Sequence, residues 1–204
     1  KNTYQDSIKY FRMKPLSGLQ IDNRESMVYG YGKDSILYQI DYTKKRLMNS
    51  YYKKHTSPSY PSTALLTDDA RYYISGHRDG TVKIWDKYNC KDGYNCKLYD
   101  ELKYSDGSIT TIDYDNDSKM LVYGDSFGTI VSYEVDRKRK RHVKKINSPI
   151  RKIHINSSRN FVSVYQNKEI DIWYFDERTD SYKRAMEKQN FNLSKMNGIE
   201  FHPN

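Results

Sequence analysis

The chain has 204 residues, a length that fits one domain, and its 35 Lys and Arg residues exceed its 26 Asp and Glu residues to give a net charge of +9. No run of about 18 apolar residues occurs in it, which excludes a membrane-spanning helix of the usual kind. Apolar residues make up 36%, below the about 45–50% of typical soluble domains, and 21 tyrosines can supply the missing packing area.

A strand-and-turn pattern repeats along the chain at intervals of 41 to 47 residues. Each copy begins with a short apolar strand and ends in polar turn residues, a pattern typical of a β-strand followed by a tight turn. The five copies begin at Leu16, Ser62, Ile109, Ile150 and Met196. The fourth position is apolar in every copy, and we expect these positions to occupy equivalent places around a common axis. In the first four copies they are Leu19, Leu65, Ile112 and Ile153.

Further strands are predicted between one copy and the next. Second strands are expected at 26–30, 72–76, 119–124 and 160–164, and third strands at 36–40, 81–85, 129–133 and 169–173. Outer strands are expected at 46–51, 96–102 and 142–146. Four short strands in a period of about 40–45 residues are typical of a propeller blade. No helical periodicity competes with this interpretation.

The most distinctive segment is 75–86, which reads SGHRDGTVKIWD. A strand ends at Gly76, a tight turn follows, and a second strand rich in β-branched residues closes with a Trp-Asp dipeptide. This segment resembles a blade of the WD40 family, and the resemblance covers the chain from Leu16 onward. Trp85 and Trp173 are 88 residues apart, as are Ser75 and Ser163, so two markers keep one offset across two blades.

The resemblance implies a buried hydrogen-bond network in each complete blade. The family places Ser or Thr on the second strand, Asp in the following turn, Trp on the third strand and His before the first strand. Blade two offers Ser75, Asp79, Trp85 and His55, and blade four offers Ser163 and Trp173, with Asn167 at the Asp position. Blades one and three depart from the pattern, because Tyr38 and Tyr133 stand near the Trp position and Phe127 replaces the Asp.

We therefore predict an all-β fold, a WD40 β-propeller segment of about four four-stranded blades plus the start of a fifth. The predicted blades span 16–54, 55–104, 105–147 and 148–190. Residues 1–15 are expected to hold the outer strand of a preceding blade and a linker, and residues 191–204 to start the next blade. Because an open stack leaves apolar end faces uncovered, the sequence favours part of a larger, seven-bladed propeller. The alternative is an open propeller that a partner's blade completes.

The run RKRKRHVKK at 137–145 holds seven basic residues and is predicted to form an exposed hairpin on the outer side of blade three. They are Arg137, Lys138, Arg139, Lys140, Arg141, Lys144 and Lys145. One interpretation is a solvated loop whose like charges repel one another. Another is docking to an anionic membrane or to RNA, and a third is a nuclear-import signal.

The turns between second and third strands are expected to gather around one mouth of the central channel, where loops of several blades converge. The candidate partner-binding residues in them are Tyr31, Lys33, His77, Arg78, Phe127 and Gln166. Aromatic and Arg side chains are the usual anchors, which favours Tyr31, Arg78 and Phe127. The alternative for each is an ordinary turn residue, and Phe127 could also pack inward where the Asp is missing.

No catalytic residue, cofactor or metal site is predicted. None of the five histidines lies in a metal-binding spacing, and Asp113, Asp115 and Asp117 fit a turn better than a calcium loop. Cys90 and Cys96 lie in a polar hairpin and are expected to be reduced thiols of a cytosolic protein, although a disulfide across the hairpin is geometrically possible.

Residues 7–136 also resemble the carboxyl-terminal propeller of BEACH-domain proteins, with SIKYFRMKPLSGLQID, VYGYGKDSILYQIDY and LYDELKYSDGSITTID carrying the likeness. The propeller of the phosphatidylinositol 3-kinase regulatory subunit is a rival for the segment from blade two to blade three. The BEACH resemblance implies a large cytosolic adaptor in membrane trafficking. The prediction is therefore a non-catalytic protein–protein interaction scaffold without a small-molecule substrate, located in the cytoplasm, or in the nucleus if the basic run directs import. The alternative is a structural, RNA-contacting subunit of a ribonucleoprotein complex that uses the 137–145 hairpin.

Overall fold

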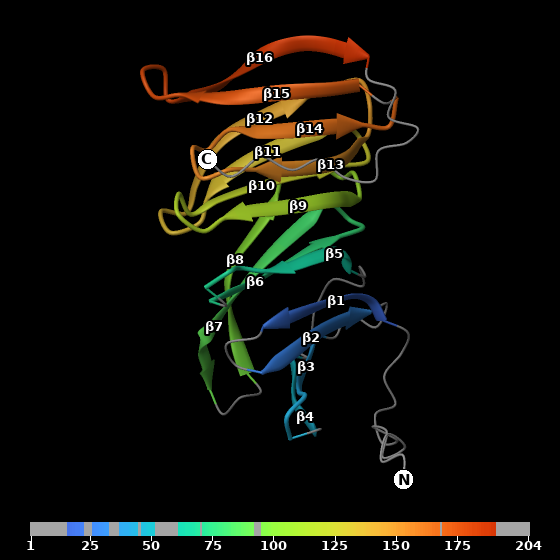
Figure 1. Ribbon diagram of the computed structural model, residues 1–204, viewed down its shortest axis with the longest axis vertical. Helices are drawn as coiled ribbons and strands as arrows, with labels where there is room; N and C mark the ends of the chain where they lie inside the picture. The colour runs from blue at the N-terminus through green and yellow to red at the C-terminus, as the bar shows by residue number, and fades with distance from the viewer. Residues whose placement is uncertain are drawn as a thin grey trace.

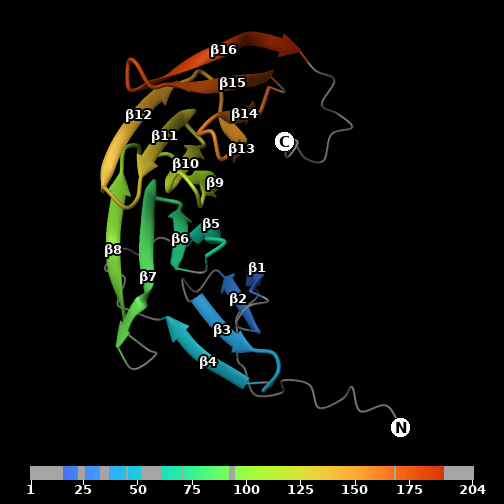
Figure 2. The same ribbon diagram turned by 60° about the vertical axis from the view of Figure 1, so that its left-hand side comes forward.

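The computed structural model describes residues 16–22, 26–32, 37–44, 46–51, 61–69, 71–91, 95–167 and 169–190. Within these residues, sixteen strands form four antiparallel sheets of four strands each, and the strand order in every sheet follows the chain. The sheets stack in chain order along the long axis (Figure 1). The stack curves, with the first strand of each sheet on the inner side of the arc (Figure 2). The predicted all-β architecture of four-stranded blades is confirmed.

We call the sheets blades one to four. Blade one consists of β1 (Leu16–Asp22), β2 (Met27–Gly32), β3 (Leu37–Asp41) and β4 (Arg46–Tyr51). Blade two consists of β5 (Pro61–Leu66), β6 (Tyr72–His77), β7 (Thr81–Lys91) and β8 (Asn95–Lys103). Blade three consists of β9 (Ile109–Asp115), β10 (Met120–Asp125), β11 (Thr129–Glu134) and β12 (Arg139–Lys145). Blade four consists of β13 (Ile150–Ile155), β14 (Phe161–Tyr165), β15 (Glu169–Asp176) and β16 (Ser181–Asn190).

The outer blade limits stay a prediction, because residues 1–15 and 191–204 lie outside the described residues. The described part of the chain contains no helix that is long and apolar enough to cross a bilayer.

The core lies between the blades, where the inner strand of one blade packs against the second strand of the blade before it. A Cβ added to Gly76 would lie 2.5 Å from Cγ2 of Ile109, and one added to Gly124 would lie 2.6 Å from Cγ2 of Ile150. Both contacts are too short for any side chain, so each glycine provides the space into which the next blade's isoleucine fits. The apolar strands are therefore positioned by blade-to-blade packing as well as by pairing within each sheet.

A hydroxyl group ties each of these joints together at the inner strands. Ser62 Oγ lies 2.5 Å from the carbonyl oxygen of Ile109, and Thr110 Oγ1 lies 2.5 Å from that of Ile150. Ser62 and Thr110 thus hold equivalent places, which makes Pro61 the equivalent of Ile109 and starts the repeat of blade two one residue earlier than predicted.

The strand register confirms this shift and corrects one expectation. Ala64 pairs with Ser75, as Ile112 pairs with Tyr123 and Ile153 pairs with Ser163. Leu65, which the sequence pattern placed at this position, pairs with Ile74 instead. The pattern failed here because Ala64 is small and Leu65 beside it gives the stronger apolar signal.

The inner strand of blade one differs from the others in burial. Leu19 is 63% exposed, whereas Ile153 is 1% exposed because blade three covers it. No blade precedes β1 in the described chain, so the side chain of Leu19 has no such cover.

Candidate interaction surfaces

Blade four contains a buried chain of hydrogen bonds that runs from its third strand to its second strand and back. Trp173 Nε1 donates to Ser163 Oγ at 2.9 Å, and Ser163 donates to the hydroxyl of Tyr165 at 2.9 Å. Tyr165 then donates to Asp171 Oδ2 at 2.5 Å. Burial and the bond to Asp171 raise the pKa of Tyr165, so the phenol keeps the proton that it donates. Arg184 on β16 completes the set, 2.8 Å from Asp171 Oδ2.

Sequence reasoning named Ser163 and Trp173 but missed Tyr165 and Asp171. The signal was available in the 88-residue offset, which aligns Tyr165 with His77 and Asp171 with Lys83. It was overlooked because Tyr165 differs in type from His77 and Asp171 has the opposite charge to Lys83.

Blade two uses the same positions with other side chains. Ser75 Oγ lies 3.0 Å from Nε2 of His77, and His77 is 3% exposed. The sequence pattern favours His77 as a partner-binding residue at the surface. This prediction is wrong, because β6 continues through His77 and buries its ring beside Ser75. The buried Lys83 lies opposite Glu101 on β8, with Nζ 3.9 Å from Oε2.

The other predicted network residues of blade two lie around this centre. Asp79 Oδ1 accepts the backbone N–H of Thr81 at 3.1 Å and stabilises the turn between β6 and β7. Trp85 packs with Leu66 and Tyr73 at the joint to blade one. His55 lies outside the described residues.

Blade three has neither the Ser nor the Trp of this pattern. The register places Tyr123 at the Ser position and Tyr133 at the Trp position, where the Tyr133 hydroxyl donates to Asp100 of blade two. Phe127 does stand where blade two has Asp79, but Asp125 takes over the capping of the turn. Its Oδ1 accepts the backbone N–H groups of Phe127 and Thr129, each at 2.8 Å.

The turns between second and third strands lie at one end of the blades, which we call the β10–β11 face. It comprises the β6–β7, β10–β11 and β14–β15 turns together with the β8–β9 and β12–β13 connections. These segments touch one another: Ser126 N donates to the carbonyl of Ser108 at 2.8 Å, and Gln166 N donates to that of Pro149 at 2.9 Å. Gly128 has a φ of +82°, which favours glycine and allows the tight β10–β11 turn. The β10–β11 and β14–β15 turns are therefore each held by a backbone hydrogen bond to the connection that leads into their own blade.

Three of the predicted partner-binding residues are exposed on this face. They are Arg78, Phe127 and Gln166. Phe127 is 57% exposed, which excludes the inward packing considered as its alternative, and Nζ of Lys145 lies 5.4 Å from its ring centroid. The side chain of Tyr31 and all of Lys33 lie outside the described residues.

Most of the basic run forms a strand instead of a hairpin loop. Its last seven residues, from Arg139, are β12, which pairs with β11 and faces blade four. The side chain of Arg141 is only 5% exposed, with Nε 2.8 Å from Glu134 Oε2 and Nη1 2.6 Å from Asp180 Oδ1. The prediction that Arg141 is an exposed, anion-binding residue is wrong, because the two carboxylates hold it at the joint between blades three and four.

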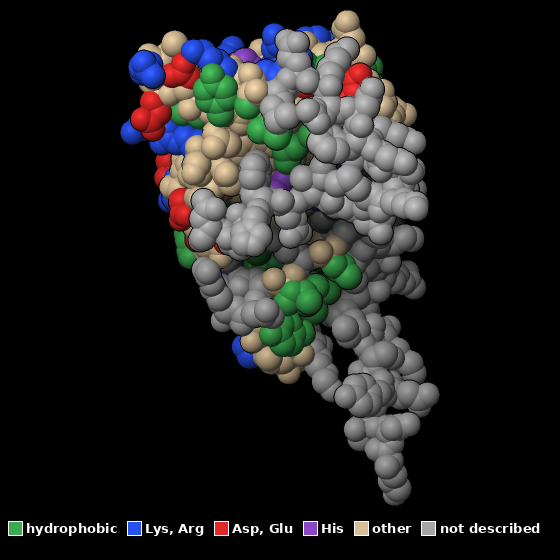
Figure 3. Space-filling model, turned by 45° about the horizontal axis from the view of Figure 1, so that its top comes forward, with side chains coloured by type: hydrophobic (Ala, Val, Ile, Leu, Met, Phe, Trp, Pro, Cys, Tyr) green, Lys and Arg blue, Asp and Glu red, His purple; other side chains and the backbone are tan. Residues whose placement is uncertain are grey.

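Most of the neighbouring cations are also paired. Arg137 lies 3.1 Å from Glu134, and Arg139 lies 2.8 Å from Asp180. Lys138 donates to the carbonyl of Tyr99 at 2.7 Å, and Lys140 lies over the ring of Tyr104. Figure 3 shows Lys and Arg side chains interspersed with Asp and Glu along the left edge of the end that carries blade four. This mixture of charges neutralises much of the run.

His142 lies in the same joint. Its ring faces those of Trp173 and Tyr182, with centroids 6.0 and 5.9 Å away. Burial, with a smaller effect of Lys144, lowers the pKa of His142 below its usual 6.5. The imidazole is therefore held neutral between two aromatic rings.

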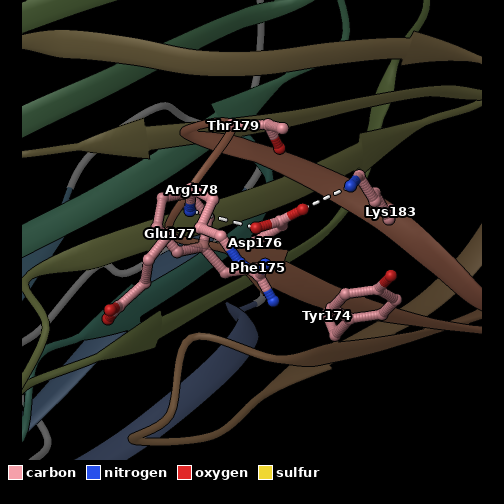
Figure 4. A pocket seen from close by; sticks show the side chains of 7 residues that line it. All are labelled: Tyr174, Phe175, Asp176, Glu177, Arg178, Thr179 and Lys183. Atoms are coloured by element: carbon pink, nitrogen blue, oxygen red, sulfur yellow. Dashed lines mark hydrogen bonds and ion pairs between the residues drawn. The ribbon is translucent and has the colours of Figure 1, made fainter.

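An open pocket of about 610 Å³ lies at the β15–β16 turn (Figure 4). Its lining residues are Tyr174, Phe175, Asp176, Glu177, Arg178, Thr179 and Lys183. Asp176 accepts bonds from Lys183 and from the backbone N–H of Arg178, and the Lys183 bond contributes most to lowering its pKa. Because one hairpin supplies the whole lining and its carboxylate stabilises the turn, the pocket adds little to the binding surface.

Metal ligation has no geometric support among the described side chains, in which no three His, Cys, Asp or Glu residues gather. Asp115 Oδ2 accepts the backbone N–H of Ser118 at 2.7 Å, as expected for a turn, and Asp113 lies 2.8 Å from His154 Nδ1 of blade four. The backbones of Cys90 and Cys96 pair across β7 and β8, which continue through the predicted loop.

The similarities to known proteins define the class. A chain in the crystal structure of the mitotic checkpoint complex matches with a TM-score of 0.69 and 12% identity, over 84% of this chain and 51% of that one. The crystal structure of the RRP9 WD40 repeats matches at 0.68 and 12%, over 85% and 52%. The computationally designed Ika4 protein matches at 0.66 and 17%, over 81% and 94%. The fold is thus that of a WD40-type β-propeller, and this chain corresponds to about half of the first two structures.

The sequence comparison is narrower. BEACH domain-containing protein A2 of Arabidopsis thaliana is 27% identical over 90 residues, which is 33% of this chain and 3% of that protein. No family model matches the chain.

Proposed function

We propose that this chain is a non-catalytic protein–protein interaction platform that binds its partner at the β10–β11 face. Phe127 carries the proposal: an aromatic ring is 57% exposed on a turn that Asp125 and Gly128 fix. A large apolar side chain that is already ordered loses little conformational entropy on binding, which makes it a suitable anchor. Arg78 and Gln166 supply polar groups on the neighbouring turns.

The finer part of the proposal is a membrane-trafficking adaptor that works in the cytoplasm. The similarity to BEACH domain-containing protein A2 supports it, together with the segments that resemble the BEACH-type propeller. In this proposal the chain contributes one binding module to a larger adaptor and has no substrate of its own.

The RNA-contacting alternative depended on five consecutive cations at 137–141. Glu134 and Asp180 now account for Arg137, Arg139 and Arg141. Lys138 and Lys140 have no described carboxylate partner but contact Tyr99 and Tyr104. Lys144 and Lys145 also lack one and lie at the far end of β12, so no continuous run of unpaired cations is left and the geometry favours the protein-binding proposal.

A phage-displayed peptide library, selected on the immobilised chain, tests this proposal. We expect Phe127→Ala to weaken binding of the selected peptides by about tenfold or more, since hot-spot anchor residues typically contribute about 2 kcal/mol or more. Tyr88→Ala is the matched control. Tyr88 is also an exposed aromatic residue, but it lies in the second half of β7, away from the β10–β11 face. Peptides that bind equally to the wild type and to Phe127→Ala, or a selection that yields no binder, would contradict the proposal.

A further inference from the structure

Five exposed cations gather at the β10–β11 face without a carboxylate partner among the residues that the structure describes. They are Arg78 on the β6–β7 turn, Lys144 and Lys145 at the end of β12, and Arg151 and Lys152 at the start of β13. The opposite end of the blades differs, because Arg137, Arg139, Arg141 and Lys183 each have an Asp or Glu partner there. Lys138, Lys140 and Arg159 at that end lack a described carboxylate partner but contact a backbone carbonyl or an aromatic ring. The β10–β11 face is therefore a place where exposed cations gather without the ion pairs that several cations of the other end make.

The carboxylates at the β10–β11 face are already engaged. Asp106 lies 3.0 Å from Lys103, and Asp79 accepts the backbone N–H of Thr81. Asp125 is buried and accepts two backbone N–H groups. None of these three carboxylates forms an ion pair with the five exposed cations among the residues that the structure describes.

Cations lie at the outer and at the inner strands of the face that carries Phe127. Lys145 of the outermost strand extends over the Phe127 ring. At the inner strands, Thr110 Oγ1 contacts the carbonyl of Ile150, and Arg151 and Lys152 follow Ile150 in the chain. A ligand whose apolar side chain rests on Phe127 would meet positive charge on both flanks.

We propose that the β10–β11 face binds an extended acidic peptide in which carboxylates flank one apolar residue. The apolar residue packs on Phe127, and the carboxylates pair with Lys145 and with Arg151. This inference rests on the proposed function and adds the chemistry of the partner. Charge complementarity of this kind raises the association rate and excludes basic competitors. A nucleic acid fits less well, because a phosphate backbone requires a continuous cationic groove with several stacking rings, whereas here Phe127 is flanked by separate cations.

The test uses the full chain and two labelled peptides that differ only in charge. One has Glu on both sides of a central Leu, and the other has Gln in place of every Glu. We expect the Glu peptide to bind about tenfold more tightly at low salt and to lose this advantage as salt screens the charges. The double variant Lys145→Gln/Arg151→Gln should bind both peptides almost equally. The control Arg137→Gln/Lys183→Gln removes the same net charge at the other end and should keep the preference.

Three results would overturn the inference, and they differ in what they say about the proposed function. Equal binding of both peptides, with binding still lost in Phe127→Ala, would leave the interaction platform standing and remove its acidic specificity. Tighter binding of a single-stranded RNA of equal charge, dependent on Lys145 and Arg151, would replace the peptide with a nucleic acid. Library peptides that bind independently of Phe127 would contradict both proposals.

Discussion

Blades two and four hold equivalent buried positions with opposite charge. In blade two Lys83 on the third strand faces Glu101 on the fourth, whereas in blade four Asp171 on the third strand meets Arg184 on the fourth. The second strands differ in parallel, with His77 in one blade and the Tyr165 phenol in the other. The comparison teaches that, where a blade buries a charge at this place, the sign of the charge is free if the neighbouring strand supplies the counter-ion. Blade three has the buried Val131 at the same register position and needs no counter-ion there.

The blades also differ in how closely the buried charge is paired. Lys83 and Asp171 are both almost fully buried, but Lys83 Nζ lies 3.9 Å from a Glu101 carboxylate that is 49% exposed, whereas Asp171 lies 2.8 Å from Arg184. A close pair that is shielded from water contributes more than a long pair that water solvates. The two counter-ions should therefore contribute different amounts to stability.

The largest effect is expected from Asp171→Ala. This change leaves Arg184 and the Tyr165 hydroxyl without their acceptor, and we expect the free energy of unfolding to fall by about 3 kcal/mol, as when one partner of a buried pair is removed. Glu101→Ala in blade two should cost about 1 kcal/mol or less, because this half-exposed carboxylate lies 3.9 Å from Lys83, beyond hydrogen-bond distance. Urea denaturation of the two variants measures both values. Equal losses would show that the two counter-ions are equivalent in spite of their different distances from the buried charge.

A smaller effect is expected from Trp173→Phe. Phenylalanine keeps most of the packing against Phe161 but lacks the N–H that donates to Ser163. We expect a loss of about 1 kcal/mol, the usual value of one intramolecular hydrogen bond. If the network acts as a unit, the double variant Trp173→Phe/Asp171→Ala should lose less than the sum of the two single variants. Strict additivity would contradict a coupled network.

The smallest effect is expected from pH at the joint between blades three and four. The pKa of His142 is lowered in the folded protein, so the unfolded chain takes up a proton first as the pH falls below about 6.5. Folding stability contributed by the neutral imidazole is therefore present above that pH and decreases below it. Denaturation midpoints between neutral pH and mildly acidic pH should fall less in His142→Gln than in the wild type. An unchanged pH dependence would show that His142 does not titrate in this range.

The repeat pattern predicted the blades because strand pairing is local. Short apolar strands separated by Asp, Asn and Gly turns leave few alternatives to an antiparallel meander, and the 88-residue offset between Trp85 and Trp173 fixed the order of the units. The equivalent surface turns follow from the same pattern, which is why the sequence alone identifies Arg78, Phe127 and Gln166 as residues of these turns.

The tertiary structure decided which of those residues are available. His77 and Arg141 have polar side chains, but β6 buries one and two carboxylates from different strands hold the other. The shift from Leu65 to Ala64 likewise follows from how β5 packs on β9, and not from the strength of its apolar signal. Sequence determines the units because each blade's strand pairing is encoded within about 45 residues. Contacts between blades join residues about 40 positions apart, so only the assembled stack settles which charges remain free.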